Sequence, residues 1–296
     1  MMARLSQDHM TVKHPAVHHN QRVHDACAAH YDSMHHEIYN PTEQYRLAAV
    51  LLESVSQMAT PPETLTILDL GAGTGNLTTH LLRLGAHVVA ADVSQKSLQR
   101  LTRKFPNNRK LRTVHLNGTD LAGFEDDTFD MVATYSVLHH IPDYLGAVGE
   151  MIRTTKPGGL IFIDHEKCPS FWLGNSPVYD DYRQQLHHLQ QAPAGVRRRN
   201  TIRKIFSMMA WRRLINRRFF GLNAEGDIHV TCHDHIEWDR LQPVLGKSCD
   251  LVRQEDYLLC EEQSFPATIY EQFRRNCSDM RYVLYRKRHP TVKPAP

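Results

Sequence analysis

The sequence predicts an α/β fold in which a mostly parallel β-sheet carries helices on both faces. Between residues 65 and 163, short apolar runs alternate with amphipathic segments. Strands separated by crossover helices have to run parallel and be buried on both sides. A glycine-rich turn joins the first apolar run to the segment after it. The composition, with 41% hydrophobic and 23% charged residues in 296, is that of a globular chain large enough for one core and an added segment.

Composition also narrows the class of protein. The chain has no run of 18 or more apolar residues, and its first 40 residues lack the apolar centre of a signal peptide. We therefore expect no membrane-spanning helix and a cytoplasmic location. The six cysteines are scattered without a CxxC spacing, which disfavours a disulfide framework, a zinc ribbon and an iron–sulfur cluster. The oligomeric state does not follow from composition.

The first predicted helix follows a histidine-rich arm. Residues 1–40 are polar, and eight of the 20 histidines lie between positions 9 and 36, so we expect an arm that becomes ordered near Tyr31. Asn40 can cap the next helix, Pro41 suits its first turn, and Glu43 stands where a capping box places an acid. This helix should end before the prolines at 61 and 62.

The elements of the core follow from the alternating pattern. The predicted strands are 65–70, 87–91, 111–116, 129–134 and 160–163, and the predicted helices are 76–84, 94–105 and 143–155. A Lys-Pro-Gly-Gly turn at 156–159 precedes the fifth strand. Together with the capped helix before them, these elements make residues 41–166 the core domain.

The rhythm changes after Glu166. For about 80 residues no strand pattern recurs, and strand-like runs return only at 251–259 and 280–285. We interpret residues 167–247 as an α-rich cap inserted after the fifth strand, and 248–288 as strands that complete the sheet. The proline-rich residues 289–296 read as a tail.

The strongest local motif is ILDLGAGTG at residues 67–75. Glycines at such a turn let the backbone approach a ligand closely, and the helix that follows offers unpaired N–H groups. A dinucleotide fingerprint, GxGxxG, would need its third glycine at position 76, which is Asn76. The glycines instead stand at 71, 73 and 75, so binding of a pyrophosphate is disfavoured.

With Asp69 before it, this turn resembles motif I of the class I S-adenosylmethionine (SAM)-dependent methyltransferases, whose cofactor carries a sulfonium and no phosphate. Further fragments agree with that family in order and spacing across residues 65–164: Asp92, NGTDLAGF at 117–124, FDMV at 129–132, SVLHHIPD at 136–143 and KPGGLIFID at 156–164. The resemblance implies a Rossmann-like, doubly wound, mostly parallel seven-stranded sheet with SAM as the cofactor.

The resemblance also implies the residues that bind the cofactor. Asp92 ends the second strand, where a carboxylate can accept hydrogen bonds from both ribose hydroxyls. Tyr31-Asp32 resembles an element of the small-molecule, quinone C-methylase-like group in which the aromatic ring closes over the cofactor; packing of that ring on the next helix is the alternative. The expected cofactor-binding residues are Tyr31, Asp69, Gly71, Ala72, Gly73, Gly75, Asp92, Val93, Asp120, Leu121 and Ser136.

Methyl transfer is an in-line displacement, so the protein's main task is to align nucleophile and methyl carbon. A hydroxyl or an acidic carbon nucleophile also needs a base. His139 and His140 follow the fourth strand, and His165 and Glu166 follow the fifth, so all four can reach one crevice. His140, His139 and His165 are therefore the candidate catalytic bases, with an ordinary structural role as the alternative for each.

Missing motifs narrow the acceptor. The loop after the fourth strand has neither the NPPY sequence with which relatives hold a planar amine nor a Pro-Cys nucleophile. Methylation of adenine, glutamine or cytosine C5 is therefore disfavoured, which leaves an oxygen, a carbon, or an amine or thiol of a metabolite as the acceptor. We predict an enzyme that transfers a methyl group to an oxygen or carbon of a small-molecule biosynthetic intermediate.

The second half of the chain leaves alternatives open. Before Lys167 there are 14 basic and 18 acidic residues, and from there on 21 and 14. Nine basic side chains lie in 197–218, and the pattern predicts a basic amphipathic helix. Three interpretations of this helix remain: a solvated lid, a pocket for an anionic substrate, or an RNA or membrane surface. A tRNA or protein methyltransferase guided by this helix is thus an alternative function, as is a non-catalytic SAM-binding protein.

A histidine- and cysteine-rich cluster stands in the same half, at His229, Cys232, His233 and His235. Alternation along one strand would put the three histidines on one face and the cysteine on the other, which does not suit a tetrahedral ion. We therefore expect no metal site. Ordinary packing, or one histidine supplying a base to the pocket, are the remaining interpretations.

Overall fold

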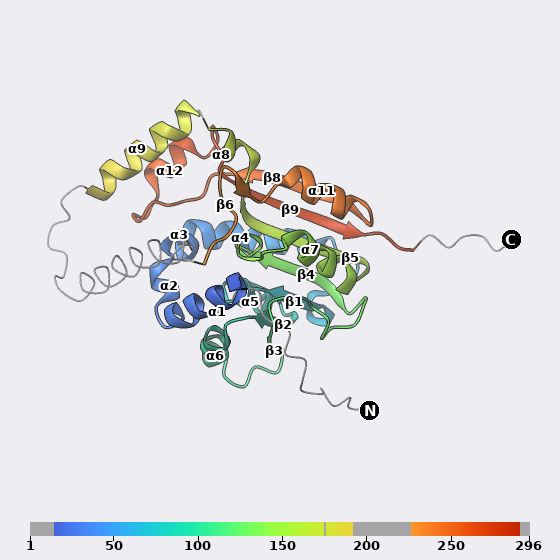
Figure 1. The fold of residues 1–296 in the computed structure, drawn as a ribbon. Coiled ribbons are helices and arrows are strands. Elements are labelled where there is room, and N and C mark those ends of the chain that lie inside the picture. The colour runs from blue at the N-terminus through green and yellow to red at the C-terminus, as the bar shows by residue number, and fades with distance from the viewer. Residues whose placement is uncertain (1–14, 175, 192–225, 291–296) are drawn as a thin grey trace.

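The computed structural model describes residues 15–174, 176–191 and 226–290. Its centre is a seven-stranded sheet (Figure 1). The strand order is β3-β2-β1-β4-β5-β9-β8, with β9 antiparallel to both of its neighbours and the other pairs parallel. The strands are β1 Thr66–Leu70, β2 His87–Asp92, β3 Leu111–His115, β4 Phe129–Tyr135, β5 Thr155–Lys167, β8 Cys249–Tyr257 and β9 Met280–Lys287. The predicted fold class is confirmed.

Helices flank this sheet, and their starts follow the sequence signals. Asn40 Oδ1 accepts the amide of Glu43 at 2.9 Å, and Ser94 Oγ accepts that of Ser97 at 3.1 Å. The α-helices are α1 Pro15–Cys27, α2 Tyr31–Met34, α3 His36–Tyr39, α4 Pro41–Ser56, α5 Asn76–Arg83, α6 Gln95–Lys104, α7 Tyr144–Thr154, α8 Pro169–Leu173, α9 Pro177–Gln191, α11 Trp238–Gly246 and α12 Thr268–Phe273. Two 3₁₀ turns, η1 Pro62–Thr64 and η2 Leu138–His140, complete them. No helix among these described residues is long and apolar enough to cross a membrane.

Apolar packing on both faces makes the sheet the core. On one face, Leu68, Val132 and Ile161 pack against α7 and α11. On the other, alternate residues of the same strands pack against α4 and α5. The strand residues include Ile67, Met131 and Phe162, and the helices contribute Leu47, Leu51 and Leu81. Adjacent residues of one strand point to opposite faces, so the central strands are apolar throughout.

The fifth strand is longer than predicted. β5 begins at Thr155, which pairs with Phe129, and the next paired residues are Leu160 and Met131. Residues 156–159, predicted as a turn before the strand, form an irregularity inside it, and Gly158 has a φ of +78°. The glycine-rich turn was predicted correctly. The longer strand was not, because Phe129, the residue that pairs with Thr155 and extends the strand, is distant in sequence.

Glu43 does not complete the expected capping box. Its buried carboxylate turns inward, pairs with Arg46 at 2.6 Å and accepts the hydroxyl of Tyr135 at 2.9 Å. Arg46 also pairs with the buried Asp164 at 2.8 Å, and Tyr257 donates to the other oxygen of Asp164 at 2.9 Å. Buried carboxylates need partners of this kind, and this network joins α4 to β4, β5 and β8.

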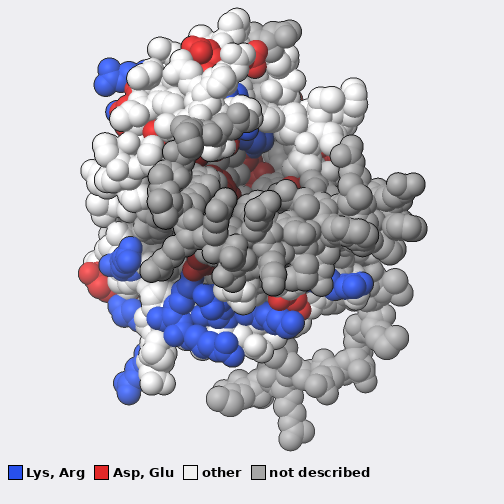
Figure 2. Space-filling model, turned by 90° about the vertical axis from the view of Figure 1, so that its left-hand side faces the viewer, with Lys and Arg blue, Asp and Glu red and all other residues white. Residues whose placement is uncertain are grey.

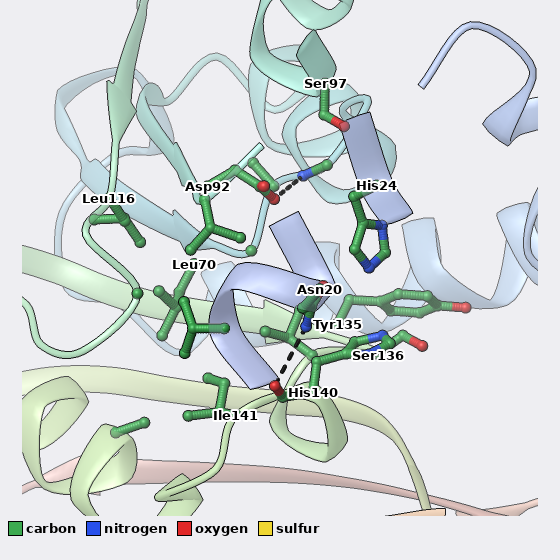
Figure 3. A pocket seen from close by; sticks show the side chains of 18 of the residues that line it. Asn20, His24, Leu70, Asp92, Ser97, Leu116, Tyr135, Ser136, His140 and Ile141 are labelled. Atoms are coloured by element: carbon green, nitrogen blue, oxygen red, sulfur yellow. Dashed lines mark hydrogen bonds between the residues drawn. The ribbon is translucent and has the colours of Figure 1, made fainter. Parts of the chain in front are cut away.

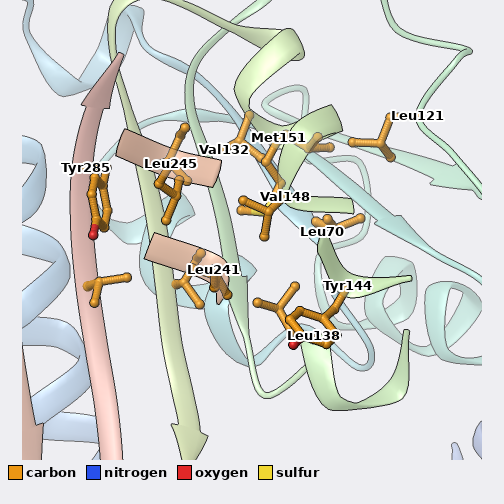
Figure 4. Packing of buried hydrophobic residues seen from close by; sticks show 14 of the residues in the cluster. Leu70, Leu121, Val132, Leu138, Tyr144, Val148, Met151, Leu241, Leu245 and Tyr285 are labelled. Atoms are coloured by element: carbon orange, nitrogen blue, oxygen red, sulfur yellow. The ribbon is translucent and has the colours of Figure 1, made fainter. Parts of the chain in front are cut away.

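The region predicted as a cap is divided in the structure. Helix α11 packs on the sheet beside α7, with Leu241 and Leu245 fully buried, and is part of the core (Figure 4). Helix α9 instead packs on α12 through a small separate cluster that includes Tyr182 and Phe273. The predicted cap thus contains one helix that packs in the core, because an apolar helical face does not specify which distant surface covers it.

The N-terminal prediction also needs correction, since the described chain is helical from Pro15 rather than ordered only near Tyr31. Val17 and Asn20 of α1 are buried, and Asp25 accepts the hydroxyl of Ser94 at 2.7 Å. The remaining arm (1–14), the basic segment 197–218 and most of the tail (291–296) lie outside the described residues.

Replacement of Leu241 by alanine tests the assignment of α11 to the core. Loss of a fully buried leucine should lower the free energy of unfolding by about 2–5 kcal/mol. The control, Leu189→Ala on α9, removes a side chain that is 41% exposed and should change it by less than about 0.5 kcal/mol. Urea denaturation measures both; equally small effects would show that α11 is not part of the core.

Candidate active site at the carboxyl ends of the strands

A cavity lies at the carboxyl ends of the first four strands, where an open α/β sheet forms its ligand crevice (Figure 3). Nine of the eleven predicted cofactor residues line it, together with one of the predicted catalytic histidines. These are Tyr31, Gly71, Ala72, Gly73, Asp92, Val93, Asp120, Leu121, Ser136 and His140.

Asp92 is fixed at the floor of this cavity. Its Oδ2 accepts the amide of Gly73 at 2.8 Å (Figure 3), and its Oδ1 accepts the amide of Ser94 at 2.7 Å. Burial raises the pKa of this carboxyl, and the two amide bonds counteract part of that effect. Each carboxylate oxygen can accept a second hydrogen bond, so Asp92 can still bind a diol.

The glycines of the turn have different roles. A Cβ atom at Gly71 would lie 2.4 Å from the side chain of Val137, so this glycine permits close packing of two loops. At Gly73, with φ of +52°, a Cβ would meet only the oxygen of Gly71 at 4.0 Å, and a side chain there would occupy the cavity. Gly75 does not line the cavity: its Cβ would meet Leu101 of α6 at 2.3 Å, so it serves helix packing.

Asp69 is likewise not among the residues that line the cavity, so its predicted contact with the cofactor stays a prediction. The side chain is 1% exposed and its Oδ2 accepts the hydroxyl of Thr78 at 2.5 Å, which ties β1 to α5. Burial raises the pKa of Asp69 to about 7. Strand alternation places this carboxyl beneath the turn, where it positions α5.

Helices α1–α3 form one wall of the cavity and are fastened to the glycine turn. Thr74 donates to Asp32 at 2.5 Å and accepts from Tyr39 at 3.0 Å. Asp32 also pairs with Lys104 of α6 at 2.6 Å. The Tyr31-Asp32 element thus combines a ring that lines the cavity with a carboxylate that anchors the wall.

Sequence reasoning missed the contribution of α1, which lines the cavity with Val17, Asn20 and His24. Asn20 donates to the carbonyl of His140 at 3.3 Å, and the ring of His24 stands edge-on to that of His140 at 5.2 Å. The three residues are spaced by three and four positions, so they share one helix face. That spacing is the signal that could have identified them.

The candidate bases differ in environment. His140 lines the cavity, and burial, with the nearby His139 and His24, holds its pKa well below the usual value. Burial also lowers the pKa of His24, to about 4. Both imidazoles are therefore neutral near pH 7, and each has a nitrogen lone pair that can accept a hydrogen bond.

Two predicted bases do not line the cavity. His139 directs Nδ1 at Glu166, 2.9 Å away; burial alone would lower the pKa of His139, but the carboxylates of Glu166 and Asp227 raise it. His165, with φ of +65°, stacks on Tyr135 at 4.6 Å instead of facing the crevice. The irregular pairing of β5 before Glu166 turns successive side chains in directions that simple alternation does not predict.

The histidine- and cysteine-rich cluster is a hairpin rather than one strand. β6 Val230–Thr231 pairs antiparallel with β7 Asp234–His235, and the turn holds Cys232 and His233. His229 pairs with Asp234 at 2.5 Å and lies 3.1 Å from the carbonyl of Ile141. The predicted alternation on one strand was wrong because the chain reverses inside the motif.

Charge in the cavity is of one sign. Its charged lining residues in the described chain are Asp92, Asp120 and Glu150, and neither lysine nor arginine lines it. On the outside, Lys and Arg gather toward the lower part of the face shown in Figure 2, where Figure 1 places α6. This helix contributes Lys96, Arg100, Arg103 and Lys104. The cavity therefore suits a cationic or neutral ligand better than a pyrophosphate.

Comparison with known proteins identifies the central part of the chain. Residues 68–163 match the methyltransferase domain family. A demethylmenaquinone methyltransferase of Clavibacter sepedonicus is 41% identical over 103 residues, which are 35% of this chain and 42% of that protein. A ubiquinone biosynthesis O-methyltransferase of Alkalilimnicola ehrlichii is 30% identical over 160 residues, 52% of this chain and 64% of that protein. The chain thus spans roughly half the length of such relatives.

Solved structures extend the likeness of fold to most of the chain. The methyltransferase complexed with the Trm112 activator of Haloferax volcanii aligns with a TM-score of 0.52 and 15% identity, over 90% of this chain and 98% of that one. An S-adenosylmethionine-dependent methyltransferase described from Listeria monocytogenes aligns with a TM-score of 0.50 and 17% identity, over 82% of this chain and 100% of that one. At these identities the similarity concerns the fold.

Asp69 should make stability depend on pH. A carboxyl whose pKa is raised from 3.8 to about 7 by folding stabilises the fold below pH about 4, and this contribution is lost as the pH rises through about 7. In Asp69→Asn the amide oxygen can still accept from Thr78, but no charge forms. We expect a smaller loss of stability between pH 5 and pH 8 than in the unmodified chain, measured by denaturation at each pH.

The control for this measurement is Asp126→Asn, which changes a carboxyl with a 73% exposed side chain. It should keep the pH dependence of the unmodified chain. An unchanged pH dependence in Asp69→Asn would show that Asp69 ionises normally in the folded protein.

Proposed function

With a methyltransferase domain at residues 68–163 as its core, we propose that this chain is a SAM-dependent enzyme that methylates an oxygen or carbon of a small-molecule biosynthetic intermediate. The observation that carries the proposal is the cavity itself. It joins a glycine turn to a carboxylate at the end of β2, and among the described residues it is lined by acidic side chains but by no lysine or arginine. Such a lining favours a phosphate-free nucleoside that carries a sulfonium.

The residues present fit this cofactor in three places. Asp92 can accept hydrogen bonds from the ribose hydroxyls. Apolar side chains after β2 and β3, including Val93, Leu116 and Leu121, can cover the adenine ring, with Asp120 within the same stretch. The open space at Gly73 can admit the amino-acid end of the molecule.

When bound, SAM supplies a methyl group on a positively charged sulfur. The chain's own contribution is to hold that group, exclude water and align the acceptor with it. Helix α1, through Asn20 and His24, lines the cavity (Figure 3), and so does Tyr31 of α2. Because the positive charge on sulfur disappears during transfer, the low polarity that burial provides favours the reaction.

For the acceptor, we propose a hydroxylated aromatic ring. The two relatives described above are named as methyltransferases of demethylmenaquinone and of ubiquinone biosynthesis. On the side of the cavity away from Asp92, the lining includes Val137, Ile141 and Pro142, which suit an apolar ring. The neutral imidazoles of His140 and His24 lie beside these residues and can accept a hydrogen bond from a ring hydroxyl.

Replacement of Asp92 by alanine should remove the ribose contact. Loss of a buried ionised acceptor of two hydrogen bonds should weaken binding of S-adenosyl-homocysteine by roughly 2–4 kcal/mol, on the order of 30- to 1,000-fold. Calorimetric titration measures this affinity. Asp126→Ala, which removes an exposed carboxyl, should leave it unchanged. Equal affinities in the two variants, both folded by circular dichroism, would mean that the cofactor lies elsewhere.

Transfer of label distinguishes the substrate classes. Purified protein is incubated with methyl-labelled SAM and a cell extract separated into small molecules, RNA and protein. We expect label in the small-molecule fraction, extractable into organic solvent, and a loss of this signal with Asp92→Ala. Label in RNA or protein would instead support guidance by the basic segment 197–218, and SAM binding without any transfer would support a non-catalytic role.

A further inference from the structure

A second group of polar side chains lies at the ends of β4 and β5, on the far side of β1 from Asp92. His139 and His140 meet Asp227, which precedes β6 in the chain. Nε2 of His139 and Nδ1 of His140 lie 3.9 Å and 3.3 Å from Oδ1 of Asp227. An ion bound at about 2.0–2.2 Å holds its ligand atoms roughly 3–4 Å apart. Both distances to Asp227 fall in this range, and the three ligand atoms all lie within 4.8 Å of one another.

The orientation of His139 suits a ligand. Its Nδ1 lies 2.9 Å from Oε2 of Glu166, which is 1% exposed. An ionised carboxylate only accepts, so Nδ1 donates. In the neutral ring, which is the form that binds a metal ion, the lone pair then stands on Nε2, the atom that faces Asp227. A carboxylate behind a ligating imidazole is the usual arrangement in metal sites, where it fixes the tautomer and raises the basicity of the ligand.

Backbone hydrogen bonds hold the group in place. The carbonyl of His139 accepts the amides of Ile228 and His229 at 2.9 and 3.0 Å, which positions Asp227. The other oxygen of Glu166 accepts the amides of Val137 and Leu138 at 3.0 and 2.8 Å. The two imidazoles and the carboxylate therefore come from segments that are tied to one another.

His140 shows the polar atom that an ion would satisfy. Its Nδ1 is buried and has no hydrogen-bond partner of good geometry in the described chain, although Asp227 is 3.3 Å away. Buried nitrogens without partners are rare and costly. The side chains of His139, His140 and Asp227 are 17%, 14% and 16% exposed, so the group is largely enclosed, and His140 is the member that lines the cavity.

We propose that His139, His140 and Asp227 bind one divalent transition-metal ion at the wall of the cavity. Two imidazole nitrogens and one carboxylate oxygen suit Zn²⁺ and its first-row neighbours, whereas Mg²⁺ and Ca²⁺ prefer oxygen ligands. Three protein ligands leave a coordination position open, as in catalytic sites. This differs from the expectation of no metal, which considered only the cluster at 229–235.

The open coordination position also suggests a role for the ion in methyl transfer. This role rests on the proposed function, whereas metal binding does not. A ring hydroxyl that enters the cavity could bind there through its oxygen. His24 would then remain as the neutral imidazole beside it, since His140 is occupied. Metal binding itself requires no methyl transfer, so the two proposals fail independently.

Zinc competition on the full chain tests the site. Metal-stripped protein is titrated with Zn²⁺ against a fluorescent chelator, and Co²⁺ substitution reports the geometry of the ion by visible absorption. We expect one tight equivalent, weakened at least about 100-fold by Asp227→Asn and by His140→Ala, because loss of an outer-shell partner alone costs 10- to 100-fold. Asp227→Asn is nearly isosteric and should leave folding intact.

The matched control is His233→Ala, which removes an exposed histidine of the nearby hairpin. It should keep the tight equivalent, and so separates this site from weak binding by the 20 histidines of the chain. If Zn²⁺ binds equally in the unmodified chain, Asp227→Asn and His140→Ala, or if no tight equivalent exists, the proposal is wrong.

Glu166 is a positioning residue in this proposal, and Glu166→Gln tests that role. The single amide oxygen of glutamine cannot serve both the backbone amides and His139. If it keeps the amides, its NH₂ faces Nδ1 and shifts the imidazole proton to Nε2. We expect Zn²⁺ affinity to fall 10- to 100-fold while the Co²⁺ spectrum keeps its shape. An unchanged affinity would show that the carboxylate does not orient the ligand.

Discussion

The carboxylate of Asp92 is the contact on which the cavity depends. It joins the turn after β1, through Gly73, to the turn after β2, through Ser94. The register of the two strands places it there, since Leu70 pairs with Ala91 and the amide of Gly71 continues to the carbonyl of Ala91. Two loops that start from neighbouring strand ends thus share one buried anion, and the floor of the cavity is defined before any ligand enters.

Glu166 has the corresponding role three strands away, at the end of β5. It accepts two amides of the loop after β4 and the ring of His139. Both carboxylates are nearly inaccessible, and a buried charge is tolerated only with several hydrogen bonds. Each therefore selects a single conformation for the loops around it. On the cofactor side and on the acceptor side of the cavity, the loops are thus held in the same way, by a buried carboxylate that accepts hydrogen bonds from backbone amides.

Burial also separates the chemistry of the histidines. His139 and His140 are adjacent in sequence, yet carboxylates raise the pKa of the first and burial lowers that of the second. Opposite shifts of neighbouring groups are typical of sites that bind or transfer protons and metals. The wall formed by α1 matters for this difference, because His24 and Asn20 contact His140 and help to exclude water. The N-terminal helices are thus part of the site rather than an appendage.

The sequence alone determined the order of the core elements, the caps at Asn40 and Ser94, and the turn that leads to the cavity. It could do so because residue spacing, capping side chains and glycine conformation act within a few residues. The tertiary structure decided which of these residues face the cavity. Asp69 and Gly75 belong to the same motif as Gly73, yet one supports α5 and the other packs on Leu101. It also placed α1 over the cavity, α11 on the sheet and Asp227 beside His140. These contacts join segments many residues apart, and an apolar face or a carboxylate carries no local mark of the partner that it will meet.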